Sequence, residues 1–318
     1  MEEYTPLYPP VGGTDASQVK RRYARLIASV MDGDRIQFSL DKNQKPHKIS
    51  AGDQAVSARQ GRQRLSQGRC SPSEDNCFIY RPEVKLAFIT SYFKPKTPAR
   101  AAEIDICLAS LMGNPLLDQV HVLVEAKDQP LPAFASIDPR TKEFVIAARP
   151  LMGDFIQYAC DHLQDHRVIF ANSDIFYDLS LEYFAKLSDS VFDSHFYAMS
   201  RWRLSTGGRS IEGFEDDLAK GITYEPYPVY GSYDTFAFAP RAICADKAKL
   251  KDLVENLNFT LGVLGSENRL LYEVRRLYPE LQMENVCGQV KSFHIHKDPS
   301  RPPEWMNRAN TDGRSYEI

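Results

Sequence analysis

The sequence lacks the features that mark membrane-spanning and secreted proteins. No apolar run in the chain approaches the roughly 20 residues that a membrane-spanning helix needs. The first residues, Met1 to Tyr4, carry no basic region followed by an apolar stretch, so no secretory signal is predicted. We therefore expect a protein without a membrane span and with a cytoplasmic location.

Cysteine is scarce, and no Cys-x-x-Cys pair occurs among the six cysteines at positions 70, 77, 107, 160, 244 and 287. A tetrahedral zinc site is therefore not expected. Cys107 and Cys160 lie in apolar periodic segments and are predicted to be buried thiols. Cys70 and Cys77 form either a disulfide or two free thiols in a loop, and a reducing cytosol favours the thiols.

A strong charge imbalance is also absent. The formal net charge of −3 gives no global electrostatic reason to expect a nucleic-acid-binding protein, although it is compatible with a local basic patch. Such a patch occurs between residues 42 and 69, which contain seven Lys or Arg side chains. This segment is either a solvated stretch or a lid or arm that contacts a phosphate-bearing ligand.

Residues 1–80 differ from the rest of the chain and are predicted to be an N-terminal extension. A helix is predicted over residues 17–31, whereas residues 41–76 are polar with little periodicity. The remaining residues, 81–318, are predicted to form one larger catalytic domain.

The first half of this domain alternates strands with helices. Strands are predicted at residues 84–90, 119–125, 143–148 and 167–171, with helices at 99–112 and 152–163. Alternation of this kind predicts an α/β fold with a parallel sheet covered on both faces. Ligands of such sheets bind beyond the carboxyl ends of the strands, here after Thr90, Val124, Ala148 and Ala171.

The second half of the domain has a different pattern. Strands are predicted at residues 195–202, 233–239 and 289–296, with no short helical crossovers between them. We therefore expect a mixed, mostly parallel sheet. Residues 81–178 are predicted to form a nucleotide-binding half, and residues 179–318 an acceptor half.

Three small polar residues, Asn172-Ser173-Asp174, follow the fourth strand. A carboxylate at this place is suited to hold Mg²⁺ or Mn²⁺, which in turn bridges phosphate oxygens. The alternative is that the three residues make a turn or cap a helix starting near Ser180.

Two further segments carry candidate side chains. His294 and His296 lie on the same face of the last strand, as metal ligands or as ordinary strand histidines. A glycine-containing loop leads into a helix with Ser266 as the expected N-cap. Glu267 in its first turn is either a positioned base or a complement to the helix dipole. Asp234 lies at another junction between a loop and a strand.

Together these segments, over residues 84–300, resemble the nucleotide-sugar glycosyltransferases of the GT-A fold. In that family an Asp-x-Asp motif holds the metal and the diphosphate. Asn172-Ser173-Asp174 matches it with Asn in the first position, so Asp174 is the surviving carboxylate ligand. The family often completes its metal site with a late histidine, which His296 matches best and His294 second.

The resemblance also implies the other roles. Glu267 corresponds to the base of inverting members, and Asp234 is the competing carboxylate on the acceptor side. If Glu267 serves only the helix, retention becomes equally compatible. Donor contacts are implied for Thr90, Ser91, Tyr92, Arg149, Asn172, Ser173, Arg201 and Trp202. The implied cofactor is Mn²⁺ or Mg²⁺, and the implied donor is a nucleoside-diphosphate sugar such as a UDP-sugar.

Rival interpretations stay open. A nucleotidyltransferase shares the parallel sheet, but its glycine-rich loop after the first strand has no counterpart in residues 91–95. A non-catalytic nucleotide-sugar-binding module is compatible with Asn172. The acceptor is a glycan, a protein, a lipid or, if the basic segment guides it, a nucleic acid with a modified base. Oligomeric state is not predicted.

Overall fold

The computed structural model describes residues 84–204, 224–226, 233–295, 308–310 and 312–318. The predicted helix at 17–31, the basic segment, Cys70, Cys77 and His296 lie outside these residues. Among the helices of the described ranges, none combines the length and apolar character that crossing a bilayer requires.

A seven-stranded sheet forms the centre of the domain, in the order β10-β6-β9-β4-β1-β2-β3. Strand β9 runs antiparallel to both β4 and β6, and the other neighbouring pairs are parallel. The strands are β1 (Leu86–Tyr92), β2 (Gln119–Glu125), β3 (Thr141–Ile146), β4 (Arg167–Ala171), β6 (His195–Ser200), β9 (Tyr233–Phe238) and β10 (Gln282–Glu284). The predicted α/β class with a mixed, mostly parallel sheet is confirmed.

A second sheet has four short strands, in the order β5-β11-β7-β8. They are β5 (Ile175–Tyr177), β11 (Ser292–His294), β7 (Trp202–Leu204) and β8 (Tyr224–Pro226). The helices are α3 (Pro98–Gly113), α4 (Ala133–Ser136), α5 (Met152–His162), α6 (Glu182–Lys186), α7 (Asp189–Asp193), α9 (Pro240–Cys244), α10 (Lys247–Asn256) and α11 (Ser266–Leu277), with 3-10 turns η1 (Ala126–Asp128) and η2 (Leu179–Leu181).

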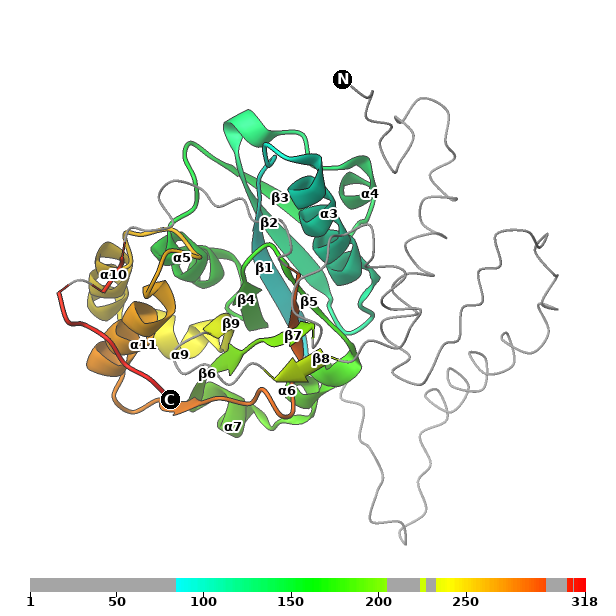
Figure 1. Ribbon diagram of the computed structural model, residues 1–318. Helices are drawn as coiled ribbons and strands as arrows, with labels where there is room; N and C mark the ends of the chain where they lie inside the picture. The colour runs from blue at the N-terminus through cyan, green and yellow to red at the C-terminus, as the bar shows by residue number, and fades with distance from the viewer. Residues whose placement is uncertain (1–83, 205–223, 227–232, 296–307, 311) are drawn as a thin grey trace, which may run out of the picture.

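Helices cover both faces of the large sheet, with α5, α9, α10 and α11 on one side and α3 and α4 on the other (Figure 1). Alternate residues of β1, β2, β4, β6 and β9 serve the two cores, whereas the edge strand β3 is largely exposed. On β4, Val168 and Phe170 pack toward α5, whereas Ile169 packs with the core beneath α3. Because both faces are buried, these strands need continuous apolar runs instead of alternating ones, which is why the sequence signals them clearly.

Several boundaries differ from the prediction. The expected strand at 195–202 is two strands in different sheets, β6 and β7, separated at Arg201. Helix α11 begins one residue after the N-cap Gly265, so Ser266 is not the cap. The φ angle of Gly265 is +76°, a left-handed conformation that glycine adopts without steric cost.

The predicted free thiol at Cys160 is wrong. Cys160 on α5 forms a disulfide with Cys244 on α9, across a sequence separation of 84 residues. Each cysteine sits in an apolar segment, and the two segments meet only because α5 and α9 pack on the same face of the sheet. Cys107 is a buried free thiol, as predicted.

Candidate active site at the carboxyl edge of the sheet

Strands β4 and β6 end, and the antiparallel β9 begins, at one edge of the large sheet. Asn172 follows β4, Arg201 follows β6, and Asp234 is the second residue of β9. These three residues are therefore brought together although they are far apart in the chain. With Glu267 they are called here the carboxylate cluster.

Asp234 is the centre of the carboxylate cluster. It is only 4% exposed, and its two carboxylate oxygens have different partners. Oδ2 accepts from Arg201 Nη1 at 2.8 Å, and Oδ1 accepts from Asn172 Nδ2 at 2.8 Å. The Asn172 backbone N–H also donates to the Asp234 carbonyl at 3.3 Å. A buried carboxylate held by a guanidinium and an amide keeps its negative charge in a fixed position.

Glu267 lies in the first turn of α11, beside Asp234. The residue as a whole is half-buried, yet its carboxyl group is largely removed from water. This burial, together with the negative charge of Asp234, raises the pKa of Glu267 from 4.5 to about 8. The cluster therefore pairs a carboxylate held in place by two hydrogen bonds with a carboxyl group, that of Glu267, whose pKa lies close to neutral pH.

We expect Asp234→Asn to lower the pKa of Glu267. The substitution removes the negative charge that disfavours the glutamate anion, and it leaves the Arg201 cation, which favours that anion. A carbon-13 NMR titration of the glutamate side chains measures the shift, and Glu267→Gln identifies the resonance. An unchanged pKa in Asp234→Asn contradicts electrostatic coupling between the two carboxyl groups.

A second group, the Asp174 cluster, consists of Arg100, Glu103, Asp174 and His294. Asp174 is 5% exposed. Its Oδ2 accepts from Arg100 Nη2 at 2.6 Å and lies 3.2 Å from His294 Nε2. Arg100 Nη1 donates to Glu103 Oε2 at 2.7 Å. The structure thus brings together Asp174 and His294, two of the three predicted metal ligands, while His296 lies outside the described residues.

The donor chemistry of the Asp174 cluster fits a divalent cation. Two buried carboxylates face a single guanidinium, so the cluster is left with a net negative charge before His294 is counted. Within the described residues, no three His, Cys, Asp or Glu side chains gather to hold a metal alone. A cation at Asp174 and His294 would therefore take its other ligands from phosphate oxygens or water, as Mg²⁺ often does.

The other predicted donor contacts lie along the same edge. The Thr90 hydroxyl near the end of β1 donates to the Ala171 carbonyl of β4 at 3.4 Å, and Ser91 beside it is half-buried. Arg149, which follows β3, places its guanidinium 5.7 Å from the centre of the Phe93 ring. Ser173 is half-buried within the turn that follows β4.

Two aromatic candidates have contacts within the protein. The Tyr92 hydroxyl donates to Asp105 Oδ1 at 3.1 Å, on α3. Trp202 Nε1 donates to the Cys287 carbonyl at 2.8 Å, and its ring packs against Phe293. Trp202 therefore connects β7 with β11 and with the segment that contains Cys287.

Arg100 and Glu103 are not predicted from the sequence. Both lie in the first two turns of α3, directly after the β1 loop, and both side chains are nearly buried. Their spacing of three residues is that of neighbours on a helix surface, which alone predicts only an ordinary surface ion pair. A signal was available in the position of α3, because the helix after the first strand of such sheets starts at the ligand-binding edge.

The fold and the site together define an α/β protein with its polar, titratable groups gathered at the carboxyl edge of a mixed sheet. No family model matches the chain, and no curated protein matches its sequence.

Solved structures with some likeness include S. aureus TarS 1-349 in complex with UDP-GlcNAc, with a TM-score of 0.43 and 11% identity over 70% of this chain and 61% of that chain. The mannosyltransferase PcManGT from Pyrobaculum calidifontis, in complex with GDP-Man and Mn²⁺, has a TM-score of 0.37 and 12% identity over 89% and 70%. The 4-diphosphocytidyl-2C-methyl-D-erythritol synthase from Anaerococcus prevotii has a TM-score of 0.40 and 10% identity over 69% and 91%.

The chain spans 38% of the length of another such structure, the glycosyltransferase GlyE of Streptococcus pneumoniae. Scores this low do not decide the activity, so function has to be inferred from the side chains of this protein.

Proposed function

We propose that this protein is a glycosyltransferase that moves a sugar from a nucleoside-diphosphate sugar to an acceptor hydroxyl or amine, with inversion at the anomeric carbon. The supporting observation is the pair formed by Glu267 and Asp234. Burial and the neighbouring charge raise the pKa of Glu267 to about 8, which suits a general base near neutral pH.

In the proposed reaction, the ionised Glu267 takes the proton of the acceptor hydroxyl. The acceptor oxygen forms a bond to the anomeric carbon while the bond from that carbon to the diphosphate oxygen breaks, and the electron pair leaves with the diphosphate. Asp234, fixed by Arg201 and Asn172, has the position to accept a hydrogen bond from another sugar hydroxyl. Holding both substrates in line contributes at most about 7–11 kcal/mol to lowering the barrier.

Asp174 and His294 are the residues that would hold a divalent cation. When bound, Mn²⁺ or Mg²⁺ would act as a Lewis acid that offsets the charge developing on the leaving diphosphate. Arg100 and Glu103 orient Asp174 in this role, since Arg100 bridges the two carboxylates. Thr90, Ser91 and Arg149 are proposed to contact the nucleotide of the donor. The proposed acceptor is a glycan, a protein, a lipid or a nucleic acid.

A screen of thermal stability tests the proposal. Nucleoside diphosphates and their sugars, each with and without Mn²⁺, are added to the protein. A ligand at 100 times its dissociation constant is expected to stabilise the folded state by about 2.7 kcal/mol, through mass action. We expect UDP or GDP, or a sugar of one of them, to raise the melting temperature only when Mn²⁺ is present. If none does so, the proposed donor class is wrong.

Product analysis separates the remaining alternatives. Mass spectrometry of the acceptor detects an added sugar for a glycosyltransferase and an added nucleotide for a nucleotidyltransferase. A protein that binds the donor but yields neither product acts as a binding module.

A further inference from the structure

The C-terminal segment, residues 308–310 and 312–318, passes beside α10 and α11 (Figure 1). Its last residue, Ile318, contacts Tyr233 at the start of β9. The segment first meets the loop that precedes Glu267, where the Ala309 N–H donates to the Leu264 carbonyl at 2.9 Å. A side-chain carbon added at Gly265 would lie 2.3 Å from Asn310 Oδ1. The segment therefore packs directly on the N-terminal end of α11.

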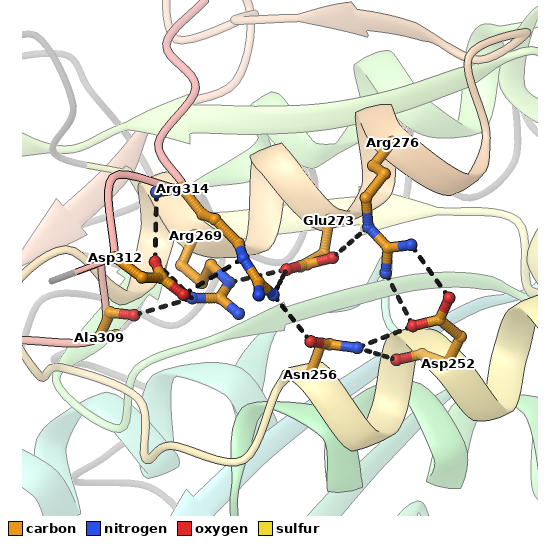
Figure 2. A network of polar contacts seen from close by, with 8 residues as sticks. All are labelled: Asp252, Asn256, Arg269, Glu273, Arg276, Ala309, Asp312 and Arg314. Carbon is orange, nitrogen blue, oxygen red and sulfur yellow. Dashed lines mark hydrogen bonds and ion pairs between the residues drawn. The ribbon is translucent and has the colours of Figure 1, made fainter.

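Ion pairs attach the middle of the C-terminal segment to the body of α11, as Figure 2 shows. Glu273 is fully buried and has three arginine partners, Arg269 at 2.8 Å, Arg276 at 2.7 Å and Arg314 at 3.2 Å. Arg269 also reaches Asp312 at 2.9 Å. Because a buried carboxylate is costly without its partners, this network keeps the segment in one position on the helix.

The last three residues link the two elements that carry the catalytic carboxylates. The Tyr316 N–H donates to the Asn268 carbonyl at 3.2 Å, and Asn268 Nδ2 donates to the Tyr316 carbonyl at 3.2 Å. Two residues later, the Tyr233 hydroxyl donates to the Ile318 carbonyl at 2.6 Å and accepts from the Ile318 N–H at 2.9 Å. Asn268 directly follows Glu267, and Tyr233 directly precedes Asp234.

We propose that residues 316–318 and Tyr233 position the active site by fixing the separation between the Asp234 strand and the Glu267 helix. This inference rests on the proposed function for its consequence in catalysis, but the structural link does not depend on it. Tyr316 and Ile318 are half-buried against the core, whereas Ser315 and Glu317 are exposed. Within residues 315–318, only alternate side chains therefore pack against the core, as in an extended strand that bridges two elements.

Two variants test the proposal. Tyr233→Phe keeps the buried ring and removes the hydroxyl that contacts Ile318, and a chain shortened by residues 316–318 removes the link entirely. Tyr278→Phe is the matched control, because the Tyr278 hydroxyl lies in the same core but donates to the Ile243 carbonyl, on α9, at 3.0 Å.

We expect faster hydrogen exchange at residues 233–238 and 263–270 in both test variants than in the control. We also expect an unchanged dissociation constant for UDP or GDP with Mn²⁺, an unchanged KM for the donor, and a kcat at least 10-fold lower, since small misplacements of a catalytic group slow turnover steeply. Exchange rates and kcat equal to those of Tyr278→Phe would overturn the proposal. If the intact protein binds neither nucleotide and has no turnover, the proposed function fails, and hydrogen exchange alone still decides whether the link holds the two elements.

Discussion

Replacing Glu267 by Gln is expected to lower kcat by about 10²–10⁴-fold, the usual contribution of a general base. Gln has nearly the same shape and retains one acceptor oxygen, but it cannot take the acceptor proton. Donor binding should change little, because the proposed donor contacts lie on Asp174, His294 and the ends of β1 and β3. Steady-state kinetics with the donor identified in the stability screen measures kcat and KM separately.

The pH dependence sharpens this prediction. The base works only when ionised, so turnover of the intact protein should fall as pH drops below about 8, the raised pKa of Glu267. This acid limb should be missing from the residual activity of Glu267→Gln. A variant that keeps near-normal turnover would show that Glu267 serves α11 alone, and the base would then be Asp234 or no side chain at all.

Stability gives a readout that needs no substrate. The native state keeps the Glu267 proton up to about pH 8, whereas the unfolded chain releases it near its ordinary pKa of 4.5. The contribution of Glu267 to stability is therefore greatest at acidic pH and is lost as pH rises through about 8. At pH values above 8, Glu267→Gln should therefore have a higher melting temperature than the intact protein. The control is Glu255→Gln, on α10, where the exposed glutamate forms only a long ion pair with Lys251 at 3.8 Å. This variant should not raise the melting temperature.

Much of the site was predictable because the topology of a parallel sheet is simple. Once Arg167–Ala171 is recognised as a buried strand, its carboxyl end has to lie at the ligand-binding edge, and Asn172 and Asp174 lie there with it. Glu267 and Asp234 lie at junctions between loops and regular elements, where the sequence predicts functional side chains, and the structure brings the two residues to each other. That they meet was not predicted.

The residues that escaped prediction depend on contacts across long stretches of chain. Arg100 pairs with Asp174, which lies 74 residues away, and no local pattern signals such a pair. Cys160 meets Cys244 only through the packing of α5 on α9. The break at Arg201 accompanies a register shift at Met199/Ser200 in the pairing of β6 with β9, which redirects the chain into the small sheet. Periodicity cannot report a bulge, because it reads each strand by itself.

Replacing Asp174 by Ala is expected to abolish the Mn²⁺-dependent part of UDP or GDP binding. We also expect Asp174→Ala to lower the free energy of unfolding, because Arg100 is nearly buried and loses one of its two carboxylate partners. Breaking a buried pair usually costs about 3–5 kcal/mol, and the lower value is expected here because Glu103 still accepts from Arg100. Denaturant unfolding measures this loss.

Asp174→Asn separates the two effects. The amide oxygen can still accept from Arg100 Nη2, so most of the stability should be retained, whereas the charge that attracts a divalent cation is gone. Asp178→Ala is a matched control from the same segment. The Asp178 side chain caps η2 by accepting from the Ser180 N–H at 2.8 Å, and it belongs to neither the carboxylate cluster nor the Asp174 cluster. The control should lose about 1 kcal/mol of stability and keep its nucleotide affinity. Calorimetric titration with UDP or GDP, with and without Mn²⁺, tests whether Asp174 binds the cation. An unchanged Mn²⁺-dependent affinity in Asp174→Asn would place the cation, or the donor, elsewhere on the sheet edge.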